Sequence, residues 1–452
     1  MSRKVPAILV LIMFSLVAIL SGCGGAKTVE PAKPKTDAPA APEQPVKKTK
    51  LTWWTYNRHD MDFMKAEIDK FNKENKFGIE IDYVIHSENF PQMVDLAYQS
   101  KQAPDLFILH ATHAAQFLNS GRLEPLEKYF SDQKKKEWAS VPRIDGAISH
   151  KGVLHALPMY TSTSRLVYNE ELFKKAGLTR PPQTLDELVA YAKKITEVGK
   201  AEGAYGFAMN MKNPTSAINR SLLQQARLDG VNYYDFSTGK YDFSGYKPYV
   251  LAWKQMWDDG SWFPGSQALD IDPLRSQFAE GKIGMYISIS AEAGVYANQF
   301  KPKMGWKAAP MPTVTADPKG TNSLNLSARL AVNAESPHKD LAWKVVDYFT
   351  NPTFLGRYMG EGLGIALLPD AKADNFKVKE LSMFTVRPTD SIWPNEPAVK
   401  LEGKPYSDVF AAVIYGQVGI DEAIADLNKR YNAALDKLPA KPMIQGWSPL
   451  RK

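Results

Sequence analysis

The chain has 452 residues, of which 44% are hydrophobic and 23% charged, with a formal net charge of +7 and one cysteine. This length exceeds what one hydrophobic core usually serves, so it predicts two lobes. The single cysteine excludes an internal disulfide framework. The positive charge is diffuse or lies in a linker near the N-terminus, which argues against a nucleic-acid-binding surface.

The first residues have the pattern of a secretory signal. Arg3 and Lys4 precede an apolar run from Val5 to Leu20, and small residues then precede Cys23. A basic start, a short apolar segment and small residues are typical of a signal that is removed. The run is shorter than the roughly 20 residues that span a bilayer comfortably, but an uncleaved membrane anchor stays open as the alternative.

Residues 24–50 have the composition of a linker. They contain five prolines, several alanines and lysines, and no aromatic residue. Such a segment buries too little apolar area to offset the entropy lost on ordering, so we expect it to be disordered. Pro-rich chains extend by about 3.1 Å per residue, which would give a tether of several tens of Å.

Strand and helix patterns alternate in the next part of the chain. Residues 51–56 and 79–85 are β-type runs, and the stretch between them has apolar residues at helical spacing. A helix around 91–99 and a buried strand at 103–109 follow. This alternation predicts a mainly parallel sheet with helices on both faces. Ligands of such sheets bind beyond the carboxyl ends of the strands.

The stretch from Gly152 to Gly177 predicts a passage between two lobes. A short strand at 156–160 leads through threonines and serines into a second strand at 165–169 and then a helix. Pro158 has no N–H to donate, so we expect the first strand to end or bend there.

The second half continues the α/β pattern. Thr184 and Glu187 have capping-box spacing before a helix, and strands are expected at 205–209 and 283–289. Residues 324–333 form a long β run with polar residues interleaved. Ser336, followed by a proline, predicts the N-cap of another helix. The tail has apolar residues at helical spacing over 424–438.

Several of these segments resemble the bacterial extracellular solute-binding proteins of ABC importers, the family that includes maltose- and oligosaccharide-binding receptors. The strings that carry the resemblance are APDLF (103–107), NSGRLEPL (119–126), GVLHALP with YNEELFKKAG (152–177), PPQTLDEL (181–188) and GLGIALLP (362–369). They occur in the familial order and extend the resemblance from about residue 51 to residue 438.

The resemblance implies a fold and a domain organisation. The fold is α/β and of the two-lobe, periplasmic-binding-protein-like type II. Each lobe has a mainly parallel sheet flanked by helices, and three crossings join the lobes. The implied organisation is a lipoprotein signal peptide at 1–22, a lipid-anchored linker at 23–50, an N-terminal lobe from 51–158 and 327–365, and a C-terminal lobe from 162–323 and 368–452. Cys23 resembles the first residue of a mature bacterial lipoprotein, which implies diacylation through its sulfur and a place on the outer face of the cytoplasmic membrane.

The ligand-binding candidates are residues at strand ends and crossings, together with aromatic residues. Rings stack on the apolar faces of sugars, and polar groups pair with sugar hydroxyls. The candidates are Tyr56, Asn57, Arg58, Thr112, His113, Tyr160, Ser162, Trp262, Ser288, Ser290, Asn325, Ser327, Arg387 and Trp393. Family members often carry Gly-x-Trp after the 283–289 strand. This chain has Ser290 and Ala291 there, so Trp262 or Trp393 could supply the ring. By contrast, we expect Trp53, Trp253 and Trp343 in the core.

The function implied by the resemblance is capture of a carbohydrate, in particular an oligosaccharide, and its delivery to ABC permease subunits. We expect a monomer with no catalysis, no cofactor and no metal. His110 and His113 are three residues apart, but no nearby cysteine or carboxylate completes a metal shell.

Two alternatives remain open. The same fold could bind a polyamine, a metal chelate, a phosphodiester or, through Arg58 or Arg387, an acidic saccharide. A secreted glycoside hydrolase would need two carboxylates across the scissile bond, and Glu292 is the only acid that follows a predicted strand end suitably.

Overall fold

The computed structural model describes residues 48–86, 89–141, 143–373, 377–387, 389–397 and 399–438, with residues 441, 443, 448 and 450. Residues 47–452 form one compact unit. The predicted signal peptide, Cys23 and nearly all of the predicted linker lie outside the described residues. Among the described residues, no helix is both long and apolar enough to cross a membrane.

The N-lobe is built around a five-stranded sheet in the order β2-β1-β3-β14-β6. Its strands are β1 (Thr49–Thr55), β2 (Ile79–Ile85), β3 (Leu106–Leu109), β6 (Ala156–Ser162) and β14 (Asn325–Val332). Its helices are α1 (Met61–Glu74), α2 (Phe90–Gln99), α3 (Ala114–Asn119), α4 (Asp132–Glu137), α12 (Lys339–Phe349) and α13 (Pro352–Gly360), and a small hairpin joins β4 (Ser149–His150) and β5 (Val153–Leu154). Trp53 and Trp343 lie in the core of this lobe, as predicted.

The C-lobe has a four-stranded sheet in the order β12-β7-β11-β8. These strands are β7 (Ser164–Asn169), β8 (Tyr205–Phe207), β11 (Ile283–Ile289) and β12 (Trp306–Ala309). Its helices are α5 (Glu170–Lys175), α6 (Leu185–Gly199), α7 (Pro214–Arg220), α8 (Leu222–Leu228), α9 (Lys247–Asp258), α10 (Ile271–Ala279), α11 (Glu292–Asn298), α14 (Tyr406–Ile414) and α15 (Ile420–Leu435). Two short pairs complete it, β9 (Tyr234–Asp235) with β10 (Lys240–Tyr241) and β13 (Asn322–Ser323) with β15 (Asp390–Ser391).

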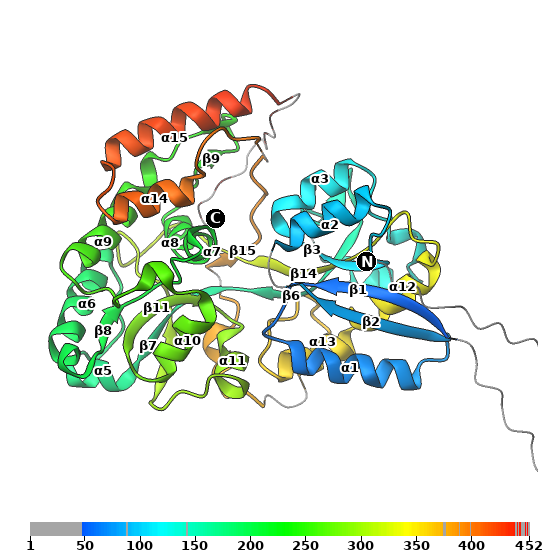
Figure 1. The fold of residues 1–452 in the computed structure, drawn as a ribbon, viewed down its shortest axis with the longest axis horizontal. Coiled ribbons are helices and arrows are strands. Elements are labelled where there is room, and N and C mark those ends of the chain that lie inside the picture. The colour runs from blue at the N-terminus through cyan, green and yellow to red at the C-terminus, as the bar shows by residue number, and fades with distance from the viewer. Residues whose placement is uncertain are drawn as a thin grey trace, which may run out of the picture. The chain divides into compact units, whose positions relative to one another are not determined.

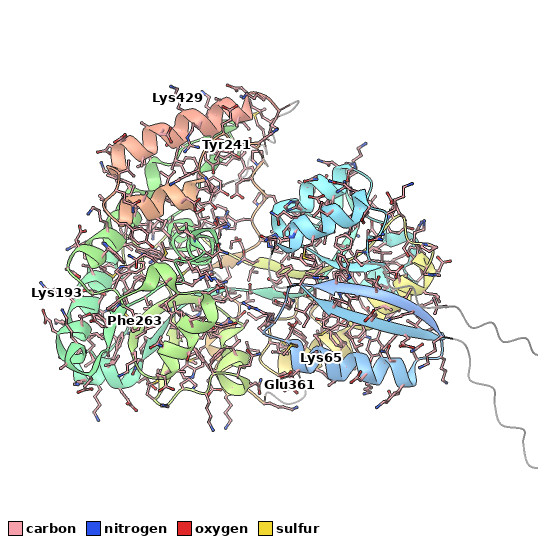
Figure 2. The ribbon with its side chains drawn as sticks, viewed as in Figure 1. Lys65, Lys193, Tyr241, Phe263, Glu361 and Lys429 are labelled. Atoms are coloured by element: carbon pink, nitrogen blue, oxygen red, sulfur yellow. The ribbon has the colours of Figure 1, made fainter. Side chains whose placement is uncertain are left out.

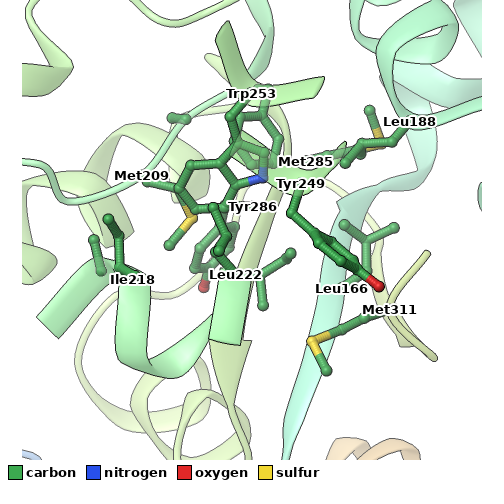
Figure 3. Close-up of a cluster of buried hydrophobic side chains, with 14 of the residues drawn as sticks. Leu166, Leu188, Met209, Ile218, Leu222, Tyr249, Trp253, Met285, Tyr286 and Met311 are labelled. Atoms are coloured by element: carbon green, nitrogen blue, oxygen red, sulfur yellow. The ribbon is translucent and has the colours of Figure 1, made fainter. Parts of the chain in front are cut away.

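The core of the C-lobe is rich in aromatic and sulfur-containing side chains. Trp253 is fully buried, as predicted, and lies beside Met209, Met285 and Tyr286 (Figure 3). Charged side chains such as Lys193 and Lys429 extend from the outer faces of α6 and α15 (Figure 2). Each lobe therefore has its own hydrophobic interior, as two lobes require.

Two paired strands extend between the lobes. β6 and β14 are antiparallel to each other, with Asn325 opposite Ser162 and Ala331 opposite Ala156. β6 continues almost directly into β7 of the C-lobe, and β13 lies just before β14 (Figure 1). These are the first two crossings, and they place the ends of both strands between the two lobes.

Both sheets are mixed, whereas the sequence predicts mainly parallel ones. In the N-lobe β1 is parallel to β2 and β3, but β14 is antiparallel to β3. In the C-lobe β7 is antiparallel to both β11 and β12, and only β11 and β8 are parallel. The antiparallel members adjoin the crossings. A strand that returns from the other lobe enters the sheet from the opposite side.

Of the two outcomes predicted for Pro158, an end or a bend of its strand, the structure excludes the end. β6 runs through Pro158 to Ser162, and this proline is opposite Arg329 of β14. β6 is the edge strand of its sheet, and edge strands are where proline is tolerated.

Three boundaries also differ from those predicted. β1 includes Thr49 and Lys50, which the sequence assigns to the linker. The N-cap of α12 is His338, while the Ser336 hydroxyl accepts the His338 N–H at 3.0 Å in the turn before it. Leu368 and Ala371 pack in the N-lobe core, so the chain leaves this lobe after residue 371. The remaining lobe boundaries stay predictions.

Candidate functional site

A cavity of about 680 Å³ lies between the two lobes, and residues of both line it. This volume is within the ~300–1,000 Å³ range of sites for small molecules. We describe it as an N-lobe wall, a floor on the crossing strands and a C-lobe wall.

The N-lobe wall follows the ends of two parallel strands. Tyr56, Asn57 and Arg58 come directly after β1, and His110 comes after β3. The Tyr56 ring contacts the His110 ring at 5.0 Å between centroids. Burial, assisted by Arg329 and His113, lowers the pKa of His110 to about 4, so its imidazole is neutral at physiological pH. This wall presents rings and an amide at the strand ends where the sequence predicts them.

The floor is formed by hydroxyl and amide groups on β6 and β14. Ser162, Asn325 and Ser327 line the cavity, and the hydroxyls of Ser162 and Ser327 are 3.3 Å apart. Tyr160 also lines the cavity, with its ring stacked on Tyr358 at 5.2 Å. A Cβ on Gly364 would meet the Tyr160 ring at 2.4 Å, so only glycine leaves room for the ring there.

Helix ends and one loop build the C-lobe wall. Asn213 caps α7, and Asp270 caps α10 by accepting the Ile271 N–H at 2.8 Å. Trp393 lies in the loop after β15, where the Arg227 guanidinium stacks on its ring at 4.6 Å and the Trp393 Nε1 donates to Thr321 at 3.0 Å. These contacts hold Trp393 in place at the cavity lining, where the residue is 5% exposed.

Contacts across the cavity join the two walls. Arg58 lies 3.4 Å from Asp272 of α10, and the Gln299 amide donates to the His59 carbonyl at 2.9 Å. Both contacts are exposed, so each contributes little to the stability of the fold.

Eight of the fourteen predicted binding residues line this cavity: Tyr56, Asn57, Arg58, Tyr160, Ser162, Asn325, Ser327 and Trp393. Their role in binding stays a prediction. Thr112 lies in a short turn between β3 and α3, and its side chain is not among those described.

The other five lie away from the cavity lining. Trp262 is 4% exposed in the C-lobe core, and its Nε1 donates to the Trp253 carbonyl at 3.2 Å. His113 contacts Asp95 at 3.5 Å, and both side chains are about four-fifths buried. The Arg387 N–H donates to Asp390 at 2.7 Å. Ser288 and Ser290 are fully buried, and the Ser288 hydroxyl donates to Glu292 at 2.6 Å. These placements share a cause, since a position near a strand end does not determine which way a side chain points.

Glu292 is a structural carboxylate. It is fully buried and accepts two hydrogen bonds from Arg275, at 2.9 Å from Nε and 2.8 Å from Nη2, in addition to the one from Ser288. Arg275 and Ser288 thus occupy both carboxylate oxygens of Glu292. The described residues contain no group of three or more His, Cys, Asp or Glu side chains placed to hold a metal ion.

Sequence reasoning missed most of the C-lobe wall, one residue of the floor and His59 of the N-lobe wall. The missed residues include His59, Asn213, Asn219, Arg220, Gln224, Arg227, Asp270, Asp272, Arg275, Arg329 and Glu396. Arg329 could have been predicted. Side chains alternate between the two faces of a strand, so Arg329 follows Asn325 and Ser327 on the same face of β14. The helix-end residues carry no comparable signal.

The comparisons with known proteins agree with this architecture. The family model of the bacterial extracellular solute-binding proteins matches residues 57–353. A mannitol-binding protein of Pseudomonas aeruginosa is 25% identical over 83% of this chain and 90% of its own length. A maltotriose-binding protein of Pyrococcus abyssi is 27% identical over 57% of this chain and 53% of its own length.

Solved structures share the two-lobe fold. An ABC transporter solute-binding protein of Thermotoga lettingae, bound to tagatose, has a TM-score of 0.70 at 20% identity and covers 86% of this chain and all of its own. The GacH receptor of Streptomyces glaucescens, studied with acarbose, has a TM-score of 0.69 at 22% identity and covers 86% of this chain and 99% of its own.

Proposed function

This chain belongs to the family of bacterial extracellular solute-binding proteins, and we propose that it is the receptor of an ABC importer for a carbohydrate. In this proposal the cavity between the lobes takes up the sugar outside the cytoplasmic membrane, and the loaded receptor delivers it to the permease. Catalysis has no part in it, and the family is one of binding proteins.

The observation that carries the proposal is the chemistry of the cavity on both of its walls. Tyr56, Tyr160 and Trp393 supply rings, and Ser162, Asn325 and Ser327 supply hydrogen-bonding groups. Rings that stack on sugar faces, combined with polar groups that pair with hydroxyls, suit a saccharide. A ligand that contacts both walls favours the closed arrangement of the lobes because it has a higher affinity for that arrangement.

The test is a thermal-shift screen with neutral mono- and oligosaccharides, polyols, uronic acids and polyamines. A solute that binds only the native state at 100 times its Kd stabilises the protein by about 2.7 kcal/mol. We expect a sugar to raise the melting temperature, and the variant W393A to bind that sugar at least tenfold more weakly than the wild type. Stabilisation by polyamines alone would contradict the proposal.

The same samples address the hydrolase alternative. Incubation with oligosaccharides should leave their chain length unchanged, as chromatography of the products will show. Shortened products would favour a glycoside hydrolase over a receptor.

We further propose that Cys23 carries the lipid anchor. The support is the pattern of basic, apolar and small residues before Cys23, followed by the Pro-rich segment 24–50. The variant C23S should lose its association with membranes after expression in a bacterial host. Unchanged membrane association of C23S would favour the uncleaved anchor instead.

A further inference from the structure

Most arginines of the cavity are neutralised by a carboxylate. Five arginines and three carboxylates line it. Arg227 is paired with Glu396, Arg275 with Glu292 and Asp272, and Arg58 lies near Asp272. Burial lowers the pKa of Arg275, but Glu292 outweighs this effect and raises it above its ordinary value. Two arginines, Arg220 and Arg329, have no such partner among the described residues.

Arg329 is a buried cation without a counterion. It lies on β14 beside the floor of the cavity and is 8% exposed. Its Nη1 donates to the Ala147 carbonyl at 3.2 Å, and no carboxylate of the described residues lies within 4.0 Å of its guanidinium. Burial lowers the pKa of Arg329, with only Tyr56 opposing the shift. A buried charge is costly unless it is paired, so this residue is poorly explained by the stability of the fold alone.

Arg220 faces the same cavity from the opposite wall. At the end of α7, its Nε and Nη2 donate to the carbonyl and hydroxyl of Ser216 at 3.2 and 3.0 Å. Its Nη1 is buried and has no hydrogen-bond partner among the described residues. The unpaired Nη1 of Arg220 is therefore enclosed by the protein and does not face the cavity. Among the described residues this leaves Arg329, on the floor, as the cavity arginine that could pair with a charged group of a solute.

We propose that the solute is an acidic saccharide of the uronate class, whose carboxylate pairs with the guanidinium of Arg329. This inference rests on the proposed function and narrows its ligand class. The planar fork of a guanidinium matches a carboxylate, and such charge-assisted pairs are stronger than neutral hydrogen bonds. Two of the three cavity carboxylates, Glu396 and Asp272, are engaged by Arg227 and Arg275. The third, Asp270, accepts the Ile271 N–H as the cap of α10.

The experiment is calorimetric titration of the wild type with di- and trigalacturonate and glucuronosyl-xylotriose, each compared with its methyl ester. The ester keeps the shape of the sugar and removes its charge. Neutral maltotriose and xylotriose, mannitol and glucose 1-phosphate complete the panel. We expect one of the uronates to bind at least tenfold more tightly than its ester and than every neutral sugar.

The variant R329Q tests whether Arg329 is the residue that pairs with the uronate carboxylate. It should bind the uronate at least tenfold more weakly and leave the affinity for the ester unchanged. The control R122Q removes an arginine of the same lobe that lies outside the cavity and pairs with Asp95, and it should bind the uronate as the wild type does. The ligand-free R329Q should melt at or above the temperature of the wild type, since it loses an unpaired buried charge. A lower melting temperature with equal losses for acid and ester would mean that Arg329 only supports the fold.

The outcomes separate this inference from the function on which it rests. Binding of neutral sugars alone overturns the inference and leaves a carbohydrate receptor. Tighter binding of glucose 1-phosphate than of every uronate overturns the assignment to a carboxylate. A panel in which no sugar binds contradicts both the inference and the proposed function.

Discussion

Replacing Glu292 by alanine is expected to lower the free energy of unfolding by about 3–5 kcal/mol, because removing one partner of a buried ion pair leaves the other charge uncompensated. Glu292 is fully buried, and Arg275, at 8% side-chain exposure, would keep only Asp272 as a counterion. The Ser288 hydroxyl would also lose its acceptor. Urea denaturation followed by circular dichroism measures the change.

The control for this substitution is E280A. Glu280 forms an ion pair with Lys303 in which both side chains are largely exposed, so its loss should cost no more than about 1 kcal/mol. Equal stability of E292A and E280A would show that the buried network does not hold this part of the C-lobe together. A catalytic Glu292 would predict a different result, namely loss of activity with little loss of stability.

The second large effect is a loss of stability on acidification that depends on His110. Its pKa is lowered from 6.5 to about 4 by burial, so between these values the unfolded chain takes up a proton that the folded protein does not. Above pH 6.5 His110 is neutral in both states and the free energy of unfolding is not reduced by its titration. As the pH falls toward 4, protonation of His110 in the unfolded chain lowers the free energy of unfolding. Below that value this reduction changes no further. A pKa difference of this size corresponds to about 3 kcal/mol.

The measurement compares the free energy of unfolding of the wild type and H110N at several pH values from 7 to 4. The variant should lose less stability over this range, and the difference between the two curves isolates His110 from the carboxylates, which titrate in both proteins. The control H150N changes a histidine on the β4–β5 hairpin, outside the cavity lining. If the free energies of unfolding of the wild type and H110N fell in parallel with pH, His110 would not be a source of the acid-induced loss of stability.

The sequence predicts the fold well because its signals are local. The alternation of IEIDYVI and the helical spacing of Met64, Ile68 and Phe71 correspond to β2 and the buried face of α1. Thr184 caps α6 by accepting the Glu187 N–H, as its spacing predicts. Strand direction and strand order depend on long-range pairing, which explains why the mixed sheets and the edge position of Pro158 could not be predicted.

The N-lobe wall and the floor were largely predictable, whereas Trp393 was the only predicted residue that lies on the C-lobe wall. Tyr56 and Asn57 follow from the rule that ligands bind beyond the carboxyl ends of parallel strands, and they line the cavity accordingly. Ser327 of the floor follows from the polar residues interleaved along the predicted crossing at 324–333. The opposite wall is made by helix ends and a loop, where nothing in the local sequence says which face meets the cavity. Trp262 shows the limit of the reasoning, because an aromatic residue at a promising position is buried among Phe207, Trp253 and Trp257.

The edge position of β6 also bears on how copies of this protein behave when they are crowded together. An exposed edge strand offers a row of unpaired backbone groups on which another chain can aggregate. All seven residues of β6 are buried, and Thr161 exchanges hydrogen bonds with Ile365 on the outer side. Strand addition by a second molecule is thereby blocked along β6, so dense packing of the protein on a surface should not lead to intermolecular sheets there.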